Sequence, residues 1–101
     1  MPIHHHVYFS FNDSASEEDT QSIVEQFYAL KKTNLIQDFF HGINNSPELL
    51  NKGLTHAFII YFSSTSDRDT YLSHPLHVAF VEYLKPFLKD VMVFDFEPST
   101  I

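Results

Sequence analysis

The segment Leu54–Phe62 constrains the fold most strongly, because its residues fit a β-strand that is apolar on both faces. Successive side chains of a strand point to opposite sides, so the segment divides into two sets. One face consists of Leu54, His56, Phe58, Ile60 and Phe62, and the other consists of Thr55, Ala57, Ile59 and Tyr61. Such a strand requires helices over one face and a further layer, often a second sheet, over the other.

Hydrophobic periodicity places further elements on both sides of this strand. Strands are expected at His5–Phe11, Leu35–Ile43 and Val91–Phe96. Helices are expected over Glu17–Lys32, around Tyr71 after the cap Ser63–Asp67, and from Pro75 to about Pro86. The order strand, helix, strand, strand, helix, strand predicts the α+β class and a ferredoxin-like βαββαβ fold. In this fold a four-stranded antiparallel sheet carries its helices on one face.

The face of this sheet that lacks helices is expected to be apolar. Its candidate members are Ile59, Tyr61, Phe94 and Phe96. An exposed apolar face of this size is unfavourable in a monomer, so we predict a homodimer in which two sheets pack face to face into a barrel. With 101 residues the chain is large enough for one core, and a single domain over residues 1–101 is expected.

Composition excludes several classes of partner and site. The formal charge of −7 argues against binding to nucleic acid or to an anionic membrane. The absence of cysteine excludes disulfides, zinc–thiolate sites and thiol nucleophiles, and it fits a cytoplasmic protein. Apolar runs fall far short of the roughly 18 residues of a membrane span, and no secretory hydrophobic region is expected at the start.

The segment Tyr71-Leu72-Ser73-His74-Pro75-Leu76-His77 carries the clearest candidate for chemistry. Pro75 suits the first turn of a helix, so His74 and His77 flank a helix start. Tyr71 comes near His77 only if the chain bends around Pro75. A hydroxyl beside an imidazole is then a proton-transfer pair that works near neutral pH. The alternative is a purely structural role, with His74 as a polar residue between two helices.

Other histidines and one carboxylate stand out in the strands. His5 shares an apolar strand face with Val7 and Phe9, and Asp95 interrupts another apolar face. Asp95 is therefore expected either near an exposed end or in contact with a polar partner such as a histidine. A third option is a metal site, since neutral imidazoles bind zinc, copper or nickel. Its candidate ligands are His4, His6, His74 and His77, but consecutive histidines on a strand point to opposite faces.

Several motifs together resemble one protein family. They are His5-His6-Val7-Tyr8-Phe9, Asn45-Ser46-Pro47-Glu48, Gly53-Leu54-Thr55-His56-Ala57-Phe58, Tyr71 to His77 with Phe80, and Phe94-Asp95-Phe96. On these residues the chain resembles the stress-responsive dimeric α/β-barrel (Dabb) family over nearly its whole length. The pair of motifs G-x-T-H and H-P-x-H, about twenty residues apart, is fairly specific in combination. The resemblance also implies that the leading histidines belong to the protein.

The resemblance implies two kinds of function. The family includes heat-stable plant proteins without a clear catalytic role and plant polyketide cyclases, whose aldol-type ring closure is assigned to a tyrosine and a histidine. By this resemblance Tyr71 would hold the carbonyl or enolate oxygen, and His77 would be the general base. His5, His56 and Asp95 would lie at the same pocket. This acid–base chemistry needs no cofactor.

Four bulky residues bear on whether that pocket is open, namely Phe9, Phe27, Tyr28 and Phe58. If they line it, a homodimer that binds a small hydrophobic carbonyl ligand is expected, with His77 and Tyr71 as catalytic residues. If they fill it, the chain is expected to form a non-catalytic stress-related dimer that is structural or binds a ligand. The sequence leaves both alternatives open.

Overall fold

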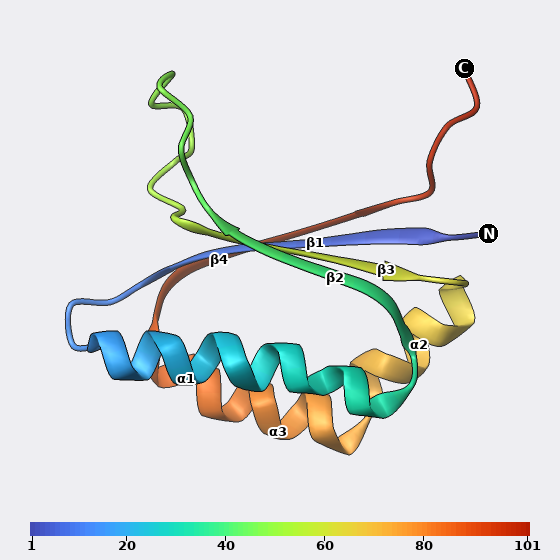
Figure 1. Ribbon diagram of the computed structural model, residues 1–101, viewed down its shortest axis with the longest axis horizontal. Helices are drawn as coiled ribbons and strands as arrows, with labels where there is room; N and C mark the ends of the chain where they lie inside the picture. The colour runs from blue at the N-terminus through green and yellow to red at the C-terminus, as the bar shows by residue number, and fades with distance from the viewer.

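The computed structural model describes all residues, Met1–Ile101, and places a four-stranded antiparallel sheet over a layer of helices (Figure 1). The strands are β1 (Ile3–Phe11), β2 (Ile36–Ile43), β3 (His56–Phe62) and β4 (Leu88–Phe96). The helices are α1 (Glu17–Tyr28), α2 (Thr65–Ser73) and α3 (Pro75–Leu84), with 3-10 turns η1 (Ala29–Thr33) and η2 (Lys85–Phe87). The predicted order of elements is confirmed.

The strands lie in the order β2-β3-β1-β4, as in a ferredoxin-like fold. β1 is central and pairs antiparallel with both β3 and β4. Its register sets His5 opposite Ile60 on one side and opposite Asp95 on the other. Residues that face one another across a ladder lie on the same side of the sheet, so this register decides which side chains can meet.

Several predicted boundaries were wrong. β1 begins at Ile3 instead of His5, and β2 begins at Ile36 instead of Leu35. The first α-helix ends at Tyr28 instead of Lys32, because its continuation tightens into a 3-10 turn that Asn34 closes in the left-handed region. β3 starts at His56 instead of Leu54, since the backbone N–H of Leu54 donates to Asn51 within a turn. β4 starts at Leu88 instead of Val91, and the prediction was wrong because the polar residues that follow Leu88 interrupt the apolar pattern of the strand.

The start of α1 follows from local chemistry. Ser16 accepts a hydrogen bond from the backbone N–H of Asp19, and the Asp19 carboxylate accepts one from the backbone N–H of Ser16. This reciprocal capping satisfies two donors that a helix start would otherwise leave free. Asp19, Glu17 and Glu18 also place negative charge in the first turn, where the helix dipole favours it.

The core lies between the sheet and the helices. Its buried apolar members are Ile3, Val7, Phe9, Ile23, Phe27, Leu30, Phe58, Ile60, Phe62, Tyr71, Phe80 and Leu84. At its centre the ring of Phe58 stacks on Phe9 and Phe27, with centroids 4.9 and 4.5 Å away. Alternate residues of β1 and β3 therefore face the helices, as predicted.

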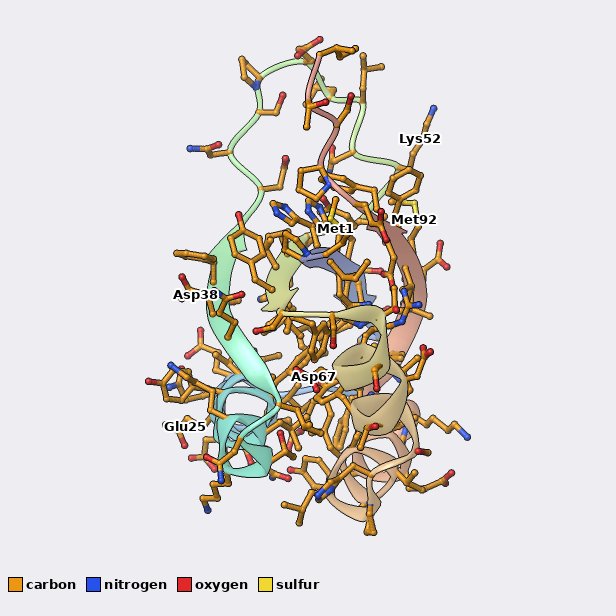
Figure 2. All side chains as sticks on the ribbon, turned by 90° about the vertical axis from the view of Figure 1, so that its right-hand side faces the viewer. Met1, Glu25, Asp38, Lys52, Asp67 and Met92 are labelled. Carbon is orange, nitrogen blue, oxygen red and sulfur yellow. The ribbon has the colours of Figure 1, made fainter.

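The opposite side of the sheet has no helix on it, and we call it the open face (Figures 1 and 2). The strand registers assign to it His4, His6, Tyr8, Phe40, Ala57, Ile59, Tyr61, Met92, Phe94 and Phe96. Phe94 is 61% exposed there. The four residues predicted for an apolar open face all belong to it. None of the helices has the length and apolarity that a bilayer span requires.

Candidate functional site

Tyr71 and His77 lie on two consecutive helices that meet at a sharp junction. His74 ends α2 and begins α3 with an extended backbone, and its ring Nδ1 accepts the backbone N–H of Leu76 at 3.1 Å. Pro75 then occupies the first helical position, where no N–H is needed. The junction brings the rings of Tyr71 and His77 to a centroid distance of 4.5 Å. The bend that their meeting requires is therefore present.

The Tyr71 hydroxyl is fully buried, and no protein group hydrogen-bonds to it. Burial raises the pKa of this phenol well above its usual value, so the hydroxyl keeps its proton across the neutral range. A buried donor without a partner is costly, and such groups concentrate at functional sites. Tyr71 is thus suited to donate a hydrogen bond to an oxygen and unsuited to act as a base.

His77 is half-buried, and its Nδ1 lies 3.0 Å from the carbonyl oxygen of Leu72. A carbonyl can only accept, so Nδ1 carries the proton and Nε2 keeps its lone pair. Desolvation lowers the pKa of His77, the bond to Leu72 opposes this, and nearby His5 lowers the pKa further. His77 is therefore neutral at neutral pH, with a free nitrogen that can accept a proton.

His5, Asp95 and Arg68 form a charged network beside this pair. The buried His5 has its Nδ1 2.6 Å from Oδ1 of Asp95, and Nη1 of Arg68 donates to Oδ2 of Asp95 at 3.0 Å. Hydrogen bonds to Asp69 and Asp95 raise the pKa of the Arg68 guanidinium. The ring of His5 lies 6.3 Å from that of Tyr71. Of the two expectations for Asp95, contact with a histidine is the one that the structure shows.

Arg68 is a member of the site that sequence reasoning missed. It lies in α2, one turn before Tyr71, in a polar segment that resembles an ordinary solvated helix start. The available signal was Asp95 itself, because a carboxylate on an apolar strand face favours a cation as well as a histidine. Which cation meets it depends on the packing of α2 against the end of β4.

His56 lies away from Tyr71 and His77. It begins β3, where its ring packs edge-on against Phe11 at 4.9 Å and stacks with His41 at 5.8 Å. Its Nδ1 lies 2.7 Å from Oγ1 of Thr55. Burial and the neighbouring His41 lower the pKa of His56. The structure thus gathers His5, Tyr71, His77 and Asp95, and it sets His56 in a separate histidine pair.

The four bulky residues named for the pocket divide into two groups. Phe9, Phe27 and Phe58 are buried and stacked in the core, whereas Tyr28 is 54% exposed on α1. Tyr28 lines a groove of about 400 Å³ together with Val24, Glu25, Phe39 and His41. None of the three main cavities is lined by His5, Tyr71 or His77.

An apolar strip on β4 leads toward the His5–Asp95 pair. Val91 and Val93 lie on the helix side of the sheet in line with Asp95, because they pair with Phe9 and Val7. They are 47% and 57% exposed, so the helices leave this strip uncovered. A hydrophobic molecule placed on the strip would lie beside the buried histidine.

The residues weighed for a metal site are divided between two sides of the sheet. His4 and His6 lie on the open face, where the His4 ring stacks on Tyr61 at 4.1 Å. His74 and His77 belong to the helical layer. No group of three or more histidine, aspartate or glutamate side chains is arranged to hold a metal ion. The structure therefore does not bring these four ligands together.

Comparison with known proteins gives a consistent picture. The model of the stress responsive A/B barrel domain matches residues 3–98. The stress-response A/B barrel domain-containing protein HS1 of Arabidopsis thaliana is 33% identical over 99% of this chain and 93% of its own length. Olivetolic acid cyclase of Cannabis sativa is 25% identical over 97% of this chain and 98% of its own.

Solved structures agree with this assignment. A crystal structure of an Arabidopsis thaliana protein superposes with a TM-score of 0.93 at 29% identity, covering 98% of this chain and 97% of the other. A Mesorhizobium loti Dabb protein with a ferredoxin-like fold gives 0.80 at 25% identity, covering 97% of both. A Bacteroides fragilis protein described as dimeric and ferredoxin-like gives 0.72 at 24% identity, covering 95% of both. This chain belongs to the stress-responsive A/B barrel domain family.

Proposed function

We propose that this protein is a homodimer that binds a small hydrophobic ligand with a carbonyl group and acts on it by acid–base chemistry. The reaction class is that of a polyketide cyclase, in which removal of a proton beside a carbonyl leads to aldol ring closure. The observation that carries the proposal is the buried Tyr71 hydroxyl, which has no protein partner and lies against the ring of His77.

The roles follow from the protonation states of the two side chains. Tyr71 keeps its proton and donates a hydrogen bond to the carbonyl oxygen, which strengthens as negative charge develops on that oxygen. Nε2 of His77 accepts the proton from the adjacent carbon, since its other nitrogen donates to Leu72. The imidazolium then returns this proton to the product oxygen, so no cofactor is needed.

The neighbouring groups support the same reaction. The contact between His5 and Asp95 lies beside the same pair, with the ring of His5 6.3 Å from that of Tyr71. The exposed strip of Val91 and Val93 supplies an apolar surface for an alkyl or aryl tail. Olivetolic acid cyclase, with 25% identity, gives the reaction class by analogy.

The homodimer is the second part of the proposal. The open face joins aromatic and aliphatic side chains from all four strands, and Phe94 alone is 61% exposed. Packing it against the same face of a second copy removes this surface from water in a contact of two-fold symmetry. Several solved structures of similar fold are described as dimeric.

A second candidate is a non-catalytic, stress-related dimer that is structural or binds a ligand. It is favoured by the stacking of Phe9, Phe27 and Phe58, which occupy the space between β1, β3 and α1. The relative HS1, also a stress-response A/B barrel protein, supports the same alternative. In this case Tyr71 contributes only to the core, and His77 only to the junction of α2 and α3 through its bond to Leu72.

Exchange of α-hydrogens for deuterium in an alkyl β-diketone, followed by proton NMR, tests the reaction without knowledge of the natural substrate. The wild type is expected to catalyse exchange, and His77→Ala to lower the rate by about a hundredfold or more. Tyr71→Phe should lower it as well, with Tyr83→Phe on α3 as the matched control that leaves it unchanged. No exchange by the wild type would favour the non-catalytic dimer.

A further inference from the structure

The connection between β2 and β3, residues Asn44–Thr55, forms an arm that rises from the open face. Both views show it on the side of the sheet opposite the helices (Figures 1 and 2). In Figure 2, Lys52 on the arm and Met92 on β4 lie on this same side. The arm therefore extends into the region where a second layer would lie.

The arm has a defined conformation of its own. At its base the N–H of Asn44 donates to the carbonyl of Thr55 at 2.8 Å, and the N–H of Thr55 donates to Phe9 at 3.1 Å. Higher up, Asn51 and Leu54 exchange two hydrogen bonds, of 2.7 and 3.0 Å. A segment that is ordered before binding loses little conformational entropy when it binds, which is typical of a preformed contact surface.

Leu49 near the tip combines two unfavourable features. Its backbone has φ of 60°, a region that a leucine occupies at a steric cost, and its side chain is 85% exposed. Leu50 beside it is also exposed. Strain and exposure at one apolar residue are accounted for if that side chain is buried in a contact outside its own chain.

The space beneath the arm also favours a contact outside the chain. A cavity of about 520 Å³ separates the arm from its own sheet. Leu50, Asn51 and Lys52 line it from the arm, and Tyr8, Ala57 and Met92 line it from the open face. Because Tyr8, Ala57 and Met92 belong to the open face, the cavity continues the surface proposed for the dimer. It is large enough for several side chains.

The length and the charge of the arm indicate which molecule it contacts. Packed sheets lie about 10 Å apart, and half of the arm, about six residues, can extend to about 20 Å. The arm can therefore pass the level of a second sheet and contact its edge. Its charged residues are Glu48 and Lys52, so the arm is neutral although the chain carries −7. A neutral arm meets a second acidic copy without net repulsion.

We propose that the arm clasps a second copy of this chain, with Leu49 as its anchoring side chain and the cavity beneath the arm receiving side chains of that copy. The inference rests on the homodimer proposed above and assigns it a contact beyond the sheet faces. The arms of the two copies make equivalent contacts, as two-fold symmetry requires.

Leu49→Asn tests the clasp, because asparagine tolerates the left-handed backbone and removes the apolar side chain without adding charge. Sedimentation over a dilution series should show a dimer Kd at least about tenfold higher than for the wild type, since each dimer contains two arms. Leu76→Asn, at an exposed leucine of α3, is the matched control and should leave the Kd unchanged. Thermal unfolding should show that both variants remain folded.

The outcomes separate the clasp from the dimer itself. A wild type that dimerises with the same Kd as Leu49→Asn overturns the clasp and leaves the dimer standing. A wild type that is monomeric at tens of micromolar overturns both. If that monomer binds an apolar dye and Leu49→Asn does not, the arm has another occupant and the proposal is wrong.

NMR of dimers mixed from labelled and unlabelled chains gives a second, direct measurement. Contacts between the Leu49 methyl groups of one copy and protons of the other are expected. Their absence in a sample that is dimeric by sedimentation would also overturn the clasp.

Discussion

At the residue scale, burial sets the opposite roles of Tyr71 and His77. Loss of solvation penalises the charged form of each group, so it raises the pKa of the phenol and lowers the pKa of the imidazole. The result is a permanent donor beside a neutral acceptor. Their rings lie 4.5 Å apart, so the donor and the acceptor are adjacent.

Replacing Tyr71 by phenylalanine tests whether the hydroxyl has a structural partner. Tyr71→Phe removes a buried donor that makes no hydrogen bond, so the free energy of unfolding should stay the same or rise by about 1 kcal/mol. Urea unfolding measures this change. A loss of more than about 1 kcal/mol would mean that the hydroxyl is satisfied in the folded protein.

Four histidines with lowered pKa values predict how stability depends on pH. The pKa values of His6, His41, His56 and His77 are lowered from 6.5 in the folded chain, chiefly by desolvation. As pH falls through 6.5 the unfolded chain therefore binds protons first, and stability decreases until the pH is below the folded pKa values. Urea unfolding at two pH values on either side of 6.5 should show this decrease.

His77→Asn should make stability fall less as pH is lowered through 6.5, because one of the four groups no longer titrates. An identical fall in stability for the variant and the wild type would contradict the role of burial at His77. For catalysis the same lowered pKa means that exchange should continue somewhat below pH 6.5, where an exposed histidine would already be protonated.

At the scale of elements, the Arg68–Asp95 ion pair ties α2 to the last strand. Arg68 and Asp95 are partly buried, and Asp95 in turn contacts the ring of His5 on β1. One carboxylate thus connects three elements that are far apart in the sequence. The junction of α2 and α3 joins this group as well, because the ring of Tyr71 lies beside the rings of both His5 and His77.

Arg68→Gln should leave Asp95 without its cation and lower the free energy of unfolding by about 1 kcal/mol. Nitrogen chemical shifts of His5 should also change, because Asp95 is less firmly oriented. Lys85→Gln, which removes the exposed pair with Glu82, is the control and should change neither. An unaltered His5 spectrum in Arg68→Gln would show that Asp95 orients the ring without help.

At the scale of the whole molecule, the proposed homodimer depends on the open face. Its aromatic surface is continuous across the four strands, and the arm rises beside it. A dimer that covers both would turn two half-covered sheets into one closed barrel. The strip of Val91 and Val93 faces the other way, so it remains free for a ligand in this arrangement.

Phe94→Asp places a charge on the open face and should raise the dimer Kd by at least about a hundredfold. Val93→Asp is the matched control, because the neighbouring residue of the same strand faces the helix side. Sedimentation should find a monomer for Phe94→Asp and a dimer for Val93→Asp at the same concentration. Dissociation of the Val93 variant alone would place the interface on the helix side.

Much of this architecture could be predicted because it depends on local patterns. Alternation along Leu54–Phe62 and spacing along α1 depend only on residues a few positions apart, and Pro75 marks a helix start by its own ring. Errors occurred at element ends, such as Leu88 and Tyr28, where a 3-10 turn or a polar stretch replaces the regular pattern. These ends are settled by competing turn geometries of similar energy.

By itself, the sequence determined the order of elements and the two faces of the sheet, because each arises from spacing within single segments. It allowed Tyr71 to meet His77 only on the condition that the chain bends at Pro75. Only the tertiary structure decided that Arg68 joins His5 and Asp95, 90 positions apart, that His56 lies away from them, and that Leu49 stands exposed on an arm. Strand register and loop conformation determine these three, and both depend on contacts between distant parts of the chain.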